Sequence, residues 1–289
     1  TQIAPDDPRV LMLRAFHAKQ RGDPALLTAI AEDIRARSDE NDTEMILVTT
    51  ELFLQANQWA QVDQNLLALA SVPGSEAQFG TRIDTLRGMR ELHAARPLVS
   101  IGHLLRGLER DPAHVPALQV LAKAYMLTGD MDSAEEACRR LATLRPLDFG
   151  IRLSLADLAW RRAGYVDARA AVMQVQGMGE TQQMLARLVE LAADLGQAKE
   201  SGRSQIFAKW QDRPKAETLA KDNAAAALWL IRCMVLAGAP ADALNLWRSG
   251  DLPSETLDAI GVELARLLLA DRQNDWALTL AKEWIARDP

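Results

Sequence analysis

The chain has 289 residues, 25% of them charged, and a formal net charge of −6. That acidic balance, with an isoelectric point near 5.4, argues against a general nucleic-acid binder, which needs a basic surface. No apolar run approaches the ~18 residues of a membrane-spanning helix, so we expect no direct membrane span in this segment.

The composition favours helices throughout. Ala, Leu and Arg are abundant, and these residues lie at the favourable end of helix propensity. No stretch shows sustained apolar alternation with Val, Ile and Thr, which would predict strands. We therefore expect an all-α protein.

The first predicted helices pair into hairpins. Residues 7–8 and 23–24 both read Asp-Pro, which combines a capping side chain with a proline suited to the first turn of a helix. After an acidic connector, a helix is predicted over residues 43–56, and the turn at 57–58 leads into another that stops at 72–75.

The third hairpin has apolar stripes over residues 79–92 and 98–108. Its turn at residues 95–97 contains no glycine. We expect this unit to depart from the pattern of the others.

Residues 115–146 carry the strongest pattern. Two helical stripes flank a Thr-Gly-Asp turn, in which Gly129 suits the left-handed backbone that ends a helix and Asp130 can cap the next one. Neither stripe is wide enough to bury itself alone, so the hairpin needs neighbouring hairpins.

This hairpin resembles the tetratricopeptide repeat, a 34-residue helix–turn–helix unit. Nine expected positions of the repeat are filled in order, by Leu118, Leu121, Ala122, Tyr125, Gly129, Met131, Ala134, Cys138 and Pro146. The spacing continues on both sides: Pro112 precedes Pro146 by 34 residues (146 − 112 = 34), and Ala156 follows Ala122 by 34. In the fifth unit Gly164 comes one place late, so its turn geometry is open.

The resemblance implies an α-solenoid of about eight such hairpins wound into a right-handed superhelix. We expect an N-terminal array over residues 1–195, an irregular connector or degenerate repeat over 196–222, and a C-terminal array over 223–289. The last residues repeat the Arg-Asp-Pro that precedes another unit earlier in the chain, which predicts that the array continues beyond Pro289.

A search for chemistry finds no catalytic or cofactor motif. Phosphate loops, nucleophile elbows and Cys-x-x-Cys pairs are absent, and the histidines never pair at metal-ligand spacing. The two cysteines, Cys138 and Cys233, lie in apolar stripes and are expected to be packing residues. We expect no enzyme activity, no metal site and no cofactor.

The resemblance also implies a binding surface, because first helices of this repeat line a concave groove. The positions that face it, and our candidate partner-binding residues, are Arg82, Met89, His93, Gln119, Lys123, Met126, Asp157, Trp160 and Arg161. The alternative is that these residues are solvated charges and ordinary helix packing. Four other tryptophans occupy second-helix packing positions and are expected in the core: Trp59, Trp247, Trp276 and Trp284.

A non-catalytic scaffold or adaptor that binds a peptide or partner protein is the function this implies. An Ala- and Arg-rich composition looks bacterial, which suggests envelope assembly, polysaccharide export or secretion. Two alternatives stay open: a partner-positioning repeat domain of a larger enzyme, and a self-assembling homo-oligomeric platform. No signal segment distinguishes a cytoplasmic from a periplasmic location.

Overall fold

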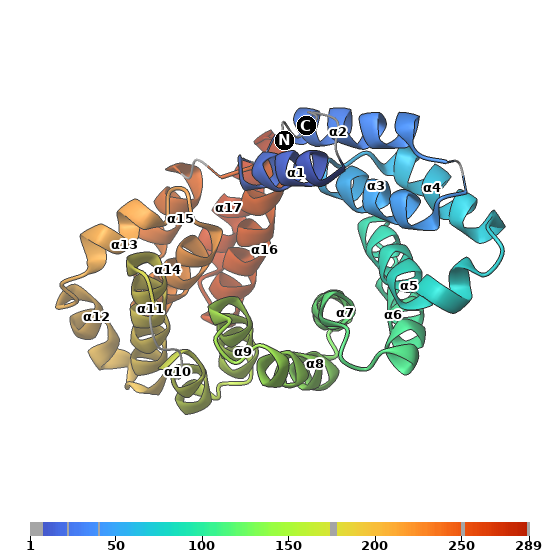
Figure 1. Cartoon of the computed structure of the whole chain (residues 1–289). Coiled ribbons are helices and arrows are strands. Elements are labelled where there is room, and N and C mark those ends of the chain that lie inside the picture. The colour runs from blue at the N-terminus through green and yellow to red at the C-terminus, as the bar shows by residue number, and fades with distance from the viewer. Residues whose placement is uncertain (1–7, 22, 40, 174–177, 250–251, 288–289) are drawn as a thin grey trace. The chain divides into compact units, whose positions relative to one another are not determined.

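The computed structural model describes residues 8–21, 23–39, 41–173, 178–249 and 252–287. Within these residues every regular element is an α-helix, and there are seventeen (Figure 1). In chain order they are α1 Pro8–Arg21, α2 Pro24–Arg37, α3 Thr43–Gln55, α4 Trp59–Ser71, α5 Ser75–His93, α6 Pro97–Arg110, α7 Val115–Thr128, α8 Met131–Leu144, α9 Phe149–Arg161, α10 Tyr165–Met173, α11 Glu180–Gln197, α12 Glu200–Ala208, α13 Arg213–Leu219, α14 Ala224–Leu236, α15 Pro240–Ser249, α16 Ser254–Ala270 and α17 Asn274–Arg287.

Sixteen of these helices form eight hairpins in which each helix packs on the next one in sequence, from α1 with α2 to α16 with α17. This confirms the all-α fold and the expected number of hairpins. The additional helix is α13, which packs against α14 in the segment expected to be irregular.

Two compact units make up the chain, Thr1–Leu144 and Arg145–Pro289. Residues 196–222 lie inside the second unit and contain two short helices, α12 and α13. The division into two arrays with a connector at 196–222 stays a prediction. Asp7 of the first predicted Asp-Pro start and the final Pro289 lie outside the described residues.

The hairpin turns share one backbone conformation. Six of the described turns place a residue in the left-handed region at the end of the first helix: Asn57, Ala95, Gly129, Ala163, Gly238 and Arg272. A left-handed residue there lets the next amide reach back and satisfy an orphan carbonyl of the last helical turn. In the fourth unit this bond runs from the Asp130 amide to the Tyr125 carbonyl, at 3.0 Å.

The third and fifth turns keep this geometry without a glycine. Ala95 and Ala163 lie 34 residues before and after Gly129 (129 − 34 = 95; 129 + 34 = 163), with φ of 55° and 57°. The amide of Gly164 donates to the Ala159 carbonyl at 2.9 Å. The expected departure of the third unit therefore does not occur in its turn, and Gly164 is the residue after the left-handed one.

Close packing of α5 on α6 depends on a missing side chain. A Cβ at Gly88 would lie 2.7 Å from the Cγ of Leu104, and the Gly88 carbonyl accepts a 2.7 Å hydrogen bond from Ser100. Gly88 is 34 residues before Ala122, the small position of the repeat (122 − 34 = 88). The close approach of α5 and α6 at this point thus requires the smallest residue there.

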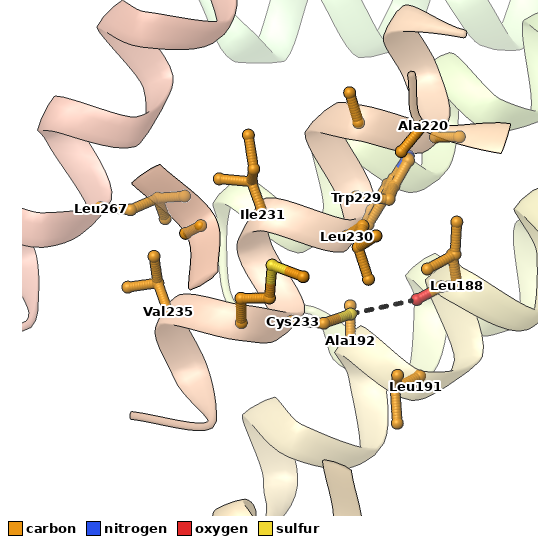
Figure 2. Packing of buried hydrophobic residues seen from close by; sticks show 14 of the residues in the cluster. Leu188, Leu191, Ala192, Ala220, Trp229, Leu230, Ile231, Cys233, Val235 and Leu267 are labelled. Carbon is orange, nitrogen blue, oxygen red and sulfur yellow. Dashed lines mark hydrogen bonds between the residues drawn. The ribbon is translucent and has the colours of Figure 1, made fainter. Parts of the chain in front are cut away.

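The core of the second unit surrounds α14, whose residues from Trp229 to Val235 are all buried (Figure 2). Cys233 packs between α14 and α11, and its thiol donates to the Leu188 carbonyl at 3.7 Å. Burial raises the pKa of this thiol well above its usual range. Both cysteines are buried and neither forms a disulfide, which confirms their role as packing residues.

Only part of the expectation for the tryptophans is confirmed. Trp247 is 1% exposed, and its indole donates to the Leu257 carbonyl at 2.9 Å. Trp276 is 37% exposed and Trp59 is half-buried, so these two are not core residues. Both stand in the first turn of a second helix. Trp284 is also half-buried, and its ring packs beside that of Trp247 with centroids 6.3 Å apart.

Candidate partner-binding groove

Four of the predicted binding residues lie together in the first unit. They line a groove of about 500 Å³ between α5 and α7, which pack directly against each other, with α4 at one end. We call it the α5–α7 groove; its lining residues are Trp59, Met89, Leu92, His93, Gln119, Val120, Lys123 and Leu127. Because α5 and α7 are first helices of consecutive hairpins, equivalent positions meet here: Met89 and Lys123 are 34 residues apart (123 − 89 = 34).

An aromatic pair forms one end of the groove. The rings of Trp59 and His93 stack with centroids 3.5 Å apart and planes within 8°. His93 is exposed and Trp59 half-buried. The pair therefore presents a flat ring surface to the groove, which a planar side chain can extend by stacking.

Lys123 supplies the charge. It is the one Lys, Arg, Asp or Glu among the described residues that line the groove. Its side chain is exposed, and within the described residues it has no ion-pair partner. An ammonium without a partner beside an apolar surface favours ligands that carry negative charge.

The other two predicted residues of the first unit lie outside this groove. Arg82 is held by Glu51 of α3 at 2.7 Å, so its charge is already compensated. Met126 is half-buried on α7 and is not part of the lining.

In the second unit, the predicted residues of α9 take part in a charge cluster instead of facing an open groove. Arg232 of α14 is 0% exposed, and its guanidinium lies 2.5 Å from Asp157 and 2.9 Å from Glu263 of α16. Arg161 pairs with the same two carboxylates, at 2.9 and 3.3 Å. We call Asp157, Arg161, Arg232, Glu263 and the two flanking tryptophans described next the Arg232 cluster.

Two indoles enclose the buried guanidinium. The carbon of the Arg232 guanidinium lies 4.5 Å from the ring centres of both Trp160 and Trp229, within the range of a cation–π interaction. The two rings meet edge to face with centroids 6.1 Å apart. Trp160 is only 7% exposed and Asp157 only 9%. The expectation that these two side chains face an open groove is therefore corrected: they are covered because they enclose Arg232.

The charges of the cluster are strongly coupled. Burial alone raises the pKa of Glu263, but hydrogen bonds from Arg266 and Arg232 and the charges of Arg232 and Arg161 outweigh it and lower the pKa to about 2. Glu263 is therefore ionised throughout the physiological range. The cluster joins α9, α14 and α16, the first helices of three hairpins, through side chains.

Sequence reasoning missed Trp59 and Arg232, and each left a signal. Arg232 interrupts the most apolar helix of the chain, and an arginine within such a run is rarely buried without a carboxylate partner. Trp59 was assigned to the core because it begins a second helix, although that same position borders the end of the neighbouring first helix.

Metal binding has no support in the described residues, where no group of three or more His, Cys, Asp or Glu side chains could hold an ion. In the same part of the chain, no helix combines the length and apolar character that crossing a membrane requires.

Comparison with known proteins identifies the fold. A tetratricopeptide repeat protein from Parabacteroides merdae matches 86% of this chain and 93% of its own length, with a TM-score of 0.57 and 13% identity. The fold is that of the tetratricopeptide-repeat proteins. A second match, to the APC/C hetero-tetramer Cut9–Hcn1, covers all of this chain and 54% of that one, with a TM-score of 0.58 and 13% identity.

No family model matches the sequence. PilW, a type IV pilus biogenesis factor, matches 72% of the chain at 17% identity, but its TM-score of 0.44 is too low to carry an inference. The comparisons thus show the fold, and tetratricopeptide arrays usually serve as non-catalytic surfaces for protein binding.

Proposed function

We propose that this chain is a non-catalytic scaffold that binds a segment of a partner protein in the α5–α7 groove. The observation that carries the proposal is the composition of that groove: an exposed ring stack, an apolar wall and one uncompensated cation on adjacent first helices. Interfaces of this kind bind through an aromatic or apolar anchor, while charge sets specificity.

Exposure of the apolar side chains supports this assignment. Leu127 is 61% exposed at the groove, although it lies on a helix whose opposite face is fully buried. An exposed leucine beside an exposed aromatic stack gains free energy when a partner removes it from water, at about 25 cal/mol per Å². The second unit has no equivalent among the residues predicted for it, because the Arg232 cluster covers Asp157 and Trp160.

Bacterial envelope assembly, polysaccharide export or secretion is the finer part of the proposal. It rests on the Ala- and Arg-rich composition. A partner that functions in one of these processes supports this part, whereas a partner from an unrelated process contradicts it and leaves the groove assignment in place.

Site-specific photocrosslinking in source cells tests the proposal. A photoreactive phenylalanine analogue replaces Leu127 in the groove or Leu98 on α6, which is 74% exposed and lies outside the groove lining. We expect a discrete crosslinked protein from position 127 and none, or a different one, from position 98. Identical products from both positions, or no product from position 127, contradict groove binding.

A further inference from the structure

The α5–α7 groove is positive although the protein is acidic. The protein has a formal net charge of −6, yet the described residues that line the groove include Lys123 and no carboxylate. Neighbouring arginines do not contribute free charge, because Arg82 is paired with Glu51 and Arg90 with Asp63 at 2.6 Å. Lys123 therefore determines which charge a bound segment carries next to α7.

The ring stack determines the kind of anchor. One face of the Trp59 ring is covered by His93, so the pair is a preformed platform at the groove end. A planar aromatic side chain continues such a stack with little loss of conformational freedom, since it has only two rotatable bonds. Arginine also stacks on rings, but its charge is repelled by Lys123.

The groove is short. Along α7 its lining runs from Gln119 to Leu127, a span of eight residue-to-residue steps (127 − 119 = 8), which at ~1.5 Å per step gives about 12 Å. An extended peptide advances ~3.3 Å per residue, so the groove accommodates about three or four residues. An aromatic anchor on the stack and a carboxylate at Lys123 thus belong to the same short segment.

We infer that the partner segment is a short acidic peptide with an aromatic anchor: an extended stretch in which Phe, Tyr or Trp stands within about three residues of Asp or Glu. The ring lies against the Trp59–His93 stack and the carboxylate pairs with the ammonium of Lys123. This inference rests on the proposed function and specifies its ligand.

Selection from a random octapeptide display library tests it, with the intact protein as bait. We expect enrichment of sequences that combine an aromatic residue with Asp or Glu, and depletion of Lys and Arg. Fluorescence anisotropy then measures the affinity of three synthetic labelled peptides, to separate the contribution of the charge from that of the ring. They are one selected sequence, the same sequence with Lys in place of its acidic residues, and the same sequence with Ala in place of its aromatic residue.

Matched variants locate the charge. Lys123→Glu is expected to weaken binding of the acidic peptide by about tenfold, since it both removes an attraction and adds a repulsion. The same variant is expected to bind the Lys-substituted peptide more tightly than the parent does. Arg82→Glu serves as the control, because Arg82 is already neutralised by Glu51 and lies outside the groove lining. Added salt is expected to weaken binding to the parent protein, because an exposed pair is screened.

The outcomes separate the two proposals. If the selected peptides show no acidic or aromatic bias but fail to bind the Leu127→Asp variant, the inference is overturned and the groove remains the binding site. Peptides that bind Leu127→Asp as well as the parent, or a library that yields no binder, overturn the proposed function as well. Circular dichroism and thermal melting confirm that each variant is folded, which is expected because Lys123 and Leu127 are exposed.

Discussion

Replacing Arg232 with methionine is the sharpest test of the second unit. The guanidinium is 0% exposed and lies between Asp157 and Glu263. Methionine fills much of the same volume but removes the one fully buried partner of the two carboxylates, leaving them the partly exposed Arg161 and, for Glu263, Arg266. Breaking a buried pair on one side typically costs about 3–5 kcal/mol.

The pKa of Glu263 gives an independent magnitude. Folding lowers it from 4.5 to about 2, a difference that corresponds to roughly 3 kcal/mol of stability at neutral pH. Arg266 and Arg161 provide part of this and remain in the variant. We therefore expect Arg232→Met to lower the free energy of unfolding by an amount at the low end of the range for a broken buried pair, about 3 kcal/mol.

Urea denaturation measures this, followed by tryptophan fluorescence because Trp160 and Trp229 flank the site. The triple variant Arg232→Met, Asp157→Asn, Glu263→Gln is the control: with the carboxylates neutralised, most of the stability is expected to return. An Arg232→Met protein within about 1 kcal/mol of the parent, or a triple variant as unstable as the single one, refutes the reasoning.

Two further predictions concern pH and backbone. The His114 ring accepts a hydrogen bond from the Ala117 amide at the start of α7. Burial lowers the pKa of this ring, a shift that the charge of Asp111 opposes and the charge of Arg82 increases. The stability that the neutral ring contributes is therefore fully present above its unfolded pKa of ~6.5 and is lost as the pH falls below that value. Thermal melts between pH 7.5 and 5 are expected to lose part of this dependence in His114→Asn, which keeps a capping side chain without a titrating ring, and an unchanged profile contradicts the role. Ala163→Gly is expected to raise stability by about 0.5–1 kcal/mol, since the left-handed backbone (φ 57°) costs alanine more than the entropy that glycine adds; Ala156→Gly on the preceding helix is the control and is expected to destabilise.

The sequence allowed the fold to be predicted almost completely, because the 34-residue spacing survives where individual residues do not. Gly129 marks a turn that alanine also forms at positions 95 and 163. The 34-residue period locates these turns without reference to glycine. A search for glycine instead places the turn of the fifth hairpin at Gly164, one residue after the left-handed Ala163.

The candidate site was only partly predictable for a related reason. Repeat position correctly brought Met89, His93, Gln119 and Lys123 together, since it depends on neighbouring hairpins alone. Whether a residue at such a position is accessible depends on side chains from other helices. Trp160 has the repeat position of a groove residue, but Arg232, 72 residues later (232 − 160 = 72), buries it.

The alanine turns have a consequence for how hairpins of this kind can be recognised in a sequence. Ala95 and Ala163 adopt the same left-handed backbone as Gly129, and the same amide-to-carbonyl hydrogen bond follows each of them. A search pattern that requires glycine at the turn therefore passes over both of these hairpins. The spacing of the turns and their dihedral angles identify such units more dependably than the residue that stands there.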